Sequence, residues 1–167
     1  MADKDSFTPD EWTLLLESPM IAGIAITAAE PSGLWGTLKE SLAGGSALAK
    51  ATIDPGVNPL VKAVAAGFKS SEGRSAARDG LQAKLKGSTP AVMKTKCIEA
   101  LRQVSALLDA KAPADASRFK DWLRQISQHT AEAASEGGLF GVGGVQVSDA
   151  EKATLTEISA ALGMAPV

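Results

Sequence analysis

Hydrophobic residues recur every three or four positions along most of the chain, which is the spacing of amphipathic α-helices. The clearest apolar stripe follows the pair Thr89-Pro90 and comprises Met93, Cys97, Leu101, Val104 and Leu108. It predicts a helix over residues 90–111. A second stripe comprises Phe119, Trp122, Leu123, Ile126 and Thr130, and it predicts a helix over 116–135. The short connection between the two favours an antiparallel helical hairpin.

Other helices are indicated by their start and stop signals. Thr8 and Glu11 form a capping box around a proline at the first helical position, which predicts a helix over 9–17. We expect Pro19 to end this helix, because an interior proline removes a backbone hydrogen-bond donor.

The C-terminal two thirds carry further signals of the same kind. They predict a helix that begins at Pro59 and breaks near residues 69–71, and another over 71–86 with few apolar positions, which should be the most exposed. A capping box beginning at Ser148 predicts a final helix that is closed by Gly163. In the N-terminal third, an apolar stripe over 34–43 predicts one more helix.

The stretch from Ser18 to Pro31 differs from all of these because it is apolar on every face. Between its two prolines only Thr27 and Glu30 carry polar side chains. A helix of this kind is buried or lies in a membrane, and about twelve residues are too few to cross a bilayer, which needs about 20. We therefore predict no transmembrane segment and a buried central helix over 19–30.

Together these elements predict the fold class. β-branched runs flanked by turn residues, which mark strands, are nearly absent from the chain. We expect an all-α protein, a compact single-domain bundle of about seven helices around the central one. The domain should occupy residues 8–164 and follow a flexible N-terminal tail over 1–7.

Charge is distributed unevenly, although the net charge of the 167 residues is only −2. Residues 1–61 contain three basic and eight acidic side chains, residues 62–124 thirteen and six, and residues 125–167 one and five. The basic middle segment 62–124 suggests binding of nucleic acid or another polyanion. The candidate anion-binding residues are Arg74, Arg78, Lys84 and Lys86. The alternative is that the acidic ends of one domain lie beside its basic middle.

Residues with catalytic or metal-binding chemistry are few. Cys97 is the single cysteine and lies within an apolar stripe, where it behaves as a small hydrophobe. His129, the single histidine, has Glu132 and Glu136 on its side of the predicted helix, but one histidine is too few for the familiar zinc or di-iron sites. We predict no catalytic residue, no cofactor and no metal site.

Two acidic residues bracket the predicted central helix. Glu17 and Glu30 either converge as a carboxylate pair or, in the case of Glu30, mark a helix end that faces water.

The segment 137–147 is unusual because apolar side chains alternate in it with glycine. It matches neither the dinucleotide-binding nor the phosphate-loop pattern, since Gln146 stands where the first needs glycine and Gly144 where the second needs lysine. Its apolar side chains either pin the connection to the core or dock a partner. The candidate docking residues are Leu139, Phe140 and Val142.

These patterns favour a non-catalytic interaction or assembly module that binds a protein partner or associates with itself. An acidic N-terminus without an apolar stretch and a single cysteine favour a cytoplasmic location. Nucleic-acid or polyanion binding by segment 62–124 is the alternative. A third hypothesis is a small-ligand carrier or enzyme with a pocket between helices.

Overall fold

The computed structural model describes residues 2–29, 58–136 and 147–166. This part of the chain is helical and contains no strand, so the predicted all-α fold is confirmed. A 3₁₀ helix over Lys4–Ser6 precedes the α-helices. The α-helices are α1 (Pro9–Ala29), α4 (Pro59–Lys69), α5 (Ser71–Leu85), α6 (Pro90–Lys111), α7 (Pro113–Glu136) and α8 (Asp149–Ala161).

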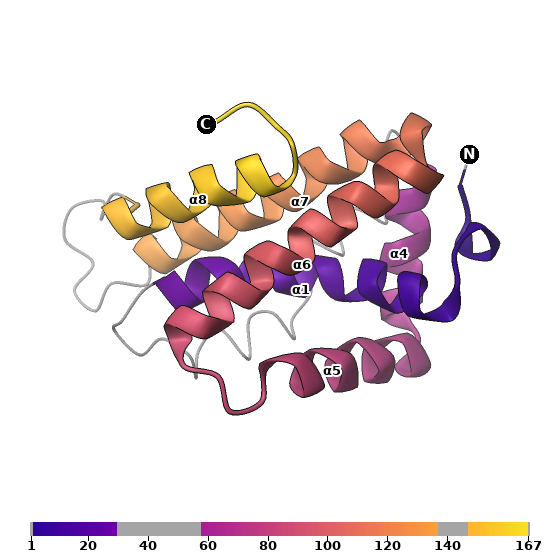
Figure 1. The fold of residues 1–167 in the computed structure, drawn as a ribbon, viewed down its shortest axis with the longest axis horizontal. Coiled ribbons are helices and arrows are strands. Elements are labelled where there is room, and N and C mark those ends of the chain that lie inside the picture. Colours follow the sequence, from indigo (N-terminus) through magenta and orange to yellow (C-terminus); the bar gives the residue numbers. More distant parts are fainter. Residues whose placement is uncertain (1, 30–57, 137–146, 167) are drawn as a thin grey trace.

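Helix α1 is the centre of the bundle, as the sequence predicts. It contacts all five other α-helices. Helix α6 crosses in front of it, α7 and α8 lie on one side, and α5 lies on the other (Figure 1). The side chains of Ala22, Ala25 and Ile26 are fully buried, whereas Ile24 is only partly buried.

The predicted break at Pro19 was wrong, because the expected helices over 9–17 and 19–30 are one continuous helix, α1, with Pro19 inside it. Pro19 has no N–H to donate to the carbonyl of Leu15, four residues earlier. The hydroxyl of Ser18 donates to that carbonyl instead, at 2.7 Å. Ser18, which precedes the expected second helix, thus supplies the missing donor at the point where the first helix continues.

This merger also explains the difference in helix count. The described residues contain six α-helices rather than about seven. Two of the expected helices are one, and the helix expected over 34–43 lies outside the described residues.

The merger also removes the premise that the apolar helix is too short to cross a membrane. With 21 residues, α1 is long and apolar enough to do so. In the structure, 72% of the most apolar 18-residue segment of α1 is buried inside the protein. A core helix passes the same test of length and composition, so the test alone is weak grounds for a membrane span.

Helices α4, α6 and α8 begin where the sequence predicts, and each start has a side-chain cap. The side chain of Asn58 accepts from the first turn of α4, that of Thr89 from the first turn of α6, and Ser148 and Glu151 form the capping box of α8. Helix α7 begins at Pro113, three residues before the expected start at residue 116. A single residue, Ala112, therefore separates α6 from α7. A proline fits this first helical position, where no donor is needed.

The N-terminal residues lie against the bundle. The ring of Phe7 is buried, with its centroid 6.2 Å from that of Trp12. The N–H of Ala2 donates to the buried carboxylate of Asp115 at 3.0 Å, and the Asn58 amide donates to the same carboxylate at 2.7 Å. Asp115 thereby joins residue 2, α4 and α7. The flexibility of residues 1–7 stays a prediction.

Candidate functional site

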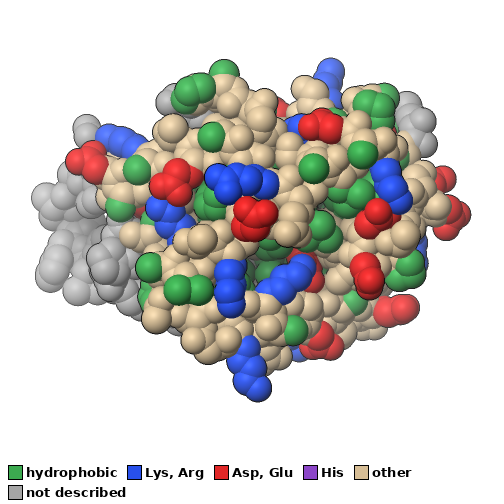
Figure 2. Space-filling view, in the orientation of Figure 1, with side chains coloured by type: hydrophobic (Ala, Val, Ile, Leu, Met, Phe, Trp, Pro, Cys, Tyr) green, Lys and Arg blue, Asp and Glu red, His purple; other side chains and the backbone are tan. Residues whose placement is uncertain are grey.

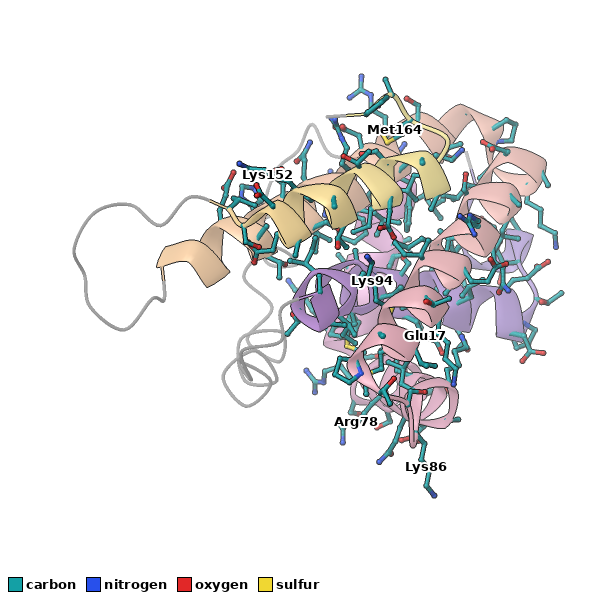
Figure 3. All side chains as sticks on the ribbon, turned by 60° about the vertical axis from the view of Figure 1, so that its left-hand side comes forward. Glu17, Arg78, Lys86, Lys94, Lys152 and Met164 are labelled. Carbon is teal, nitrogen blue, oxygen red and sulfur yellow. The ribbon has the colours of Figure 1, made fainter. Side chains whose placement is uncertain are left out.

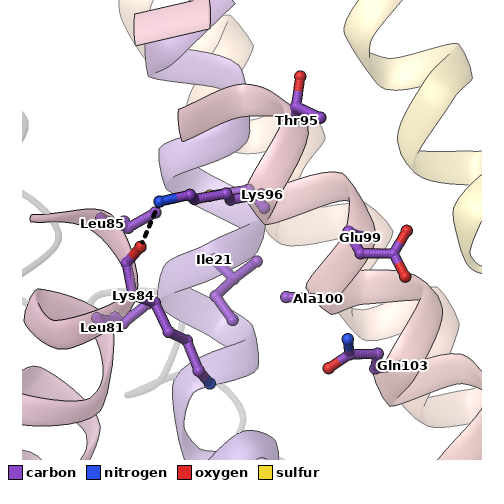
Figure 4. A pocket seen from close by; sticks show the side chains of 10 residues that line it. Ile21, Leu81, Lys84, Leu85, Thr95, Lys96, Glu99, Ala100 and Gln103 are labelled. Atoms are coloured by element: carbon purple, nitrogen blue, oxygen red, sulfur yellow. Dashed lines mark hydrogen bonds between the residues drawn. The ribbon is translucent and has the colours of Figure 1, made fainter. Parts of the chain in front are cut away.

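A groove of about 430 Å³ opens at the surface between α5 and α6. Its floor is the α1 residue Ile21, which lies between the two walls in Figure 4. The apolar part of the walls comprises Leu81, Leu85, Cys97 and Ala100. In Figure 2 this face of the molecule is hollowed, with hydrophobic side chains at the bottom and basic side chains beside the hollow.

The groove exists because α5 packs closely on α1 and touches α6 little. The buried residues of α5 are Gly73, Ala77 and Leu81, of which two are small. Gly80 allows the close approach to α1, because a methyl group there would overlap Oε1 of Glu17 and lie 3.1 Å from its Cδ. The helix therefore lies against α1 and leaves a gap beside α6.

Polar side chains connect the walls of the groove. The carboxylate of Glu17 is only 1% exposed and pairs with the ammonium of Lys84 on α5. Lys96 reaches from α6 to α5 and donates to the backbone carbonyl of Lys84 at 2.9 Å (Figure 4). It also donates to the hydroxyl of Ser88 at 2.9 Å. We call these four residues, Glu17, Lys84, Ser88 and Lys96, the polar clasp.

The four candidate anion-binding residues do not form one site. Lys84 is directed at Glu17 and belongs to the polar clasp. Arg74 and Arg78 are exposed one turn apart on α5, and Lys86 is exposed at its C-terminal cap. Arg78 and Lys86 point outward at the edge of the bundle, away from Glu17 (Figure 3).

Acidic residues from both ends of the chain pair with the basic middle segment. Glu11 pairs with Lys111 at 2.6 Å, and this lysine lowers the pKa of the Glu11 carboxyl. Glu157 pairs with Lys94 at 2.9 Å, and Glu17 with Lys84. Further pairs lie within the segment and join Lys120 to Asp109, Arg124 to Asp121 and Arg102 to Glu99. The acidic ends thus lie beside the basic middle.

Cys97 is 2% exposed, and burial raises the pKa of its thiol to about 12. A nucleophilic cysteine needs a lowered pKa and an accessible sulfur, so Cys97 behaves as part of the core. The side chain of His129 is 65% exposed and lies 3.5 Å from Glu132. Among the described residues, no group of histidine, cysteine and acidic side chains could hold a metal ion.

Several predicted positions lie outside the described residues. The candidate docking residues Leu139, Phe140 and Val142 are among them. Glu30 is another, so only one member of the predicted carboxylate pair is placed, and Glu17 pairs with a lysine.

Sequence reasoning did not find the groove. The usable signal was the composition of α5, where Gly73, Ala77 and Gly80 permit close packing on one side and leave little apolar bulk for a second neighbour. Comparison of this chain with protein-family models, with curated proteins and with solved structures finds no match.

Proposed function

We propose that this protein is a non-catalytic interaction module that binds a protein partner in the groove between α5 and α6. The observation that carries the proposal is the apolar, open shape of the groove, with Ile21 as its floor and a polar rim. Such grooves accept the apolar face of an amphipathic helix, whose side chains are three or four residues apart. A cytoplasmic location remains part of the proposal.

The chemistry of Cys97 supports the non-catalytic part. Cys97 lines the groove, and the raised pKa of its thiol keeps the group protonated at neutral pH. A small-ligand carrier would use the same groove, because about 430 Å³ lies within the range of ligand sites. The open shape favours a protein partner.

Site-specific photo-crosslinking in cells of the native organism tests the proposal. A photoreactive residue at position 103, on the groove wall, should give a discrete protein adduct. The same residue at the exposed position 125 on α7 is the control and should not give that adduct. Leu85→Asp should abolish the adduct at position 103, because it places a charge on the apolar wall.

The mass of the adduct and sedimentation velocity of the purified chain identify the type of partner. An adduct of twice the chain's mass, together with a dimer that Leu85→Asp dissociates, would indicate self-association. A folded protein that gives neither an adduct at position 103 nor a dimer would contradict the proposal.

The glycine-rich segment remains a second proposed docking element, in which Leu139, Phe140 and Val142 supply apolar contact. If it docks a partner, Phe140→Ser should lower the mass of the assembly and leave the melting temperature of the monomer unchanged. If it is pinned to its own core, the same substitution should lower the melting temperature, because burying a phenylalanine contributes about 1.5–3 kcal/mol.

A further inference from the structure

We infer that the C-terminal half of α5 is a movable wall of the groove, which the polar clasp holds shut. Opening of this wall widens the groove and uncovers Ile21 and Glu17. The opening itself is independent of the proposed function, and only its use by a partner rests on that function.

The first argument is the small apolar contact of α5. Its C-terminal half buries a single large side chain, Leu81, and half-buries Leu85. By contrast, α6 buries six residues, among them Ile98, Leu101 and Leu108. Helices with few buried apolar contacts open locally at a lower free energy than the core.

The second argument is that polar groups hold this half in place. Lys84 joins it to Glu17 of α1, and Lys96 joins the backbone carbonyl of Lys84 to α6. The Glu17 carboxylate is buried, so loss of its lysine partner leaves a charge that only entry of water can solvate. Removal of Lys84 should therefore favour the open state.

The third argument is the different character of the two ends of α5. At the N-terminal end Ser70 caps both α4 and α5, and Gly73 packs against the carbonyl of Gly67, which makes a tight corner. At the C-terminal end Gly87 has a φ of +72° and open space around it. The corner at Ser70 thus fixes the N-terminal half of the helix, whereas the C-terminal half can unwind from the turn at Gly87.

Amide hydrogen exchange of the whole chain, followed by mass spectrometry, tests this inference without any partner. In the wild type, amides of residues 78–86 should exchange faster than those of residues 97–108 in α6. Lys84→Met should accelerate exchange in residues 78–86 by roughly tenfold or more, which corresponds to about 1.4 kcal/mol, and leave α8 unchanged. The double variant Glu17→Gln/Lys84→Met should exchange more slowly than Lys84→Met, because no charge is left buried.

Lys94→Met is the matched control, since it removes a lysine whose partner Glu157 is exposed, and it should leave α5 unchanged. Lys96→Met keeps the inference testable if Lys84→Met does not fold, and it should accelerate α5 alone by a smaller factor. Equal exchange of α5 and α6 in the wild type would overturn the inference. The inference would also be overturned if Lys84→Met or Lys96→Met accelerated amide exchange equally in all helices.

Discussion

Gly80 is the residue that allows α5 to lie against α1. A methyl group at this position would overlap the Glu17 carboxylate, which is held in place by Lys84. In an exposed helix, glycine to alanine stabilises by about 1 kcal/mol because alanine is the better helix former. Here the steric overlap opposes that gain.

We therefore expect Gly80→Ala to destabilise the protein by about 1–3 kcal/mol, the usual cost of overpacking. Urea unfolding followed by circular dichroism would measure it. Ser75→Ala on the exposed side of α5 is the control and should change stability by less than about 0.5 kcal/mol. A stabilised Gly80→Ala protein would show that Glu17 moves aside at little cost.

Cys97 gives a second expectation at the scale of one residue, this time for pH. Its pKa is about 12 in the folded protein and about 9.0 in an exposed thiol. Between these values the unfolded chain has released the thiol proton and the folded chain has kept it. Stability should therefore fall as pH rises above about 9, at about 1.4 kcal/mol per pH unit from this group.

The difference between the wild type and Cys97→Ala isolates this effect from other groups that titrate at high pH. The variant should be less stable at pH 7, because it loses buried volume, and should have a shallower pH dependence of the unfolding free energy above pH 9. Parallel pH profiles would contradict the burial of the thiol. At pH 8 the native thiol should also resist aromatic disulfide reagents until denaturant is added.

Among the elements, α1 depends on a hydrogen bond at its proline. The Ser18 hydroxyl supplies the donor that Pro19 lacks, at the carbonyl of Leu15. Ser18→Ala should cost about 1 kcal/mol, the usual contribution of one such bond.

A double-mutant cycle distinguishes this role from simple packing of Ser18. In a Pro19→Ala background the backbone N–H of residue 19 can donate to the Leu15 carbonyl. Ser18→Ala should therefore reduce the free energy of unfolding by less in that background than in the wild type. Urea midpoints of the four proteins give the coupling. Equal costs of Ser18→Ala in both backgrounds would mean that the serine acts independently of the proline.

The elements also show what could be predicted from the sequence. Caps at Thr8, Asn58, Thr89 and Ser148 are local signals, and the structure confirms all four helix starts. The predicted break at Pro19 was wrong because the neighbouring hydroxyl of Ser18 supplies the hydrogen-bond donor that proline lacks. The groove was not predicted, because the small residues of α5 indicate close packing on one side but do not set the distance between α5 and α6.

For the whole molecule, the ion pairs between the acidic ends and the basic middle reduce the field that a polyanion would meet. Lys84, Lys94 and Lys111 each pair with an acidic residue from outside the segment. We expect at most weak binding of a labelled duplex or single-stranded oligonucleotide at about 50 mM salt, where phosphate contacts are strong.

Charge reversal provides the check on this expectation. Arg74→Glu, Arg78→Glu and Lys86→Glu together reverse three exposed charges on α5 and its C-terminal cap, and they leave the Lys84 pair intact. Anisotropy of the oligonucleotide should be the same with this variant as with the wild type. Tight, salt-sensitive binding that the triple variant abolishes would instead favour the polyanion hypothesis.

The position of α1 in the chain has a consequence for biosynthesis. The ribosome makes this helix before every other α-helix of the described structure, yet α6, α7 and α8, which cover much of it, come last. At about 5–20 residues per second, roughly 4 to 16 seconds pass between the end of α1 and the end of α6. During that time the 21-residue apolar segment lacks α6, α7 and α8, and it resembles the segments that nascent-chain chaperones and membrane-targeting factors bind. Competition for this nascent helix should therefore affect how much folded protein a cell obtains.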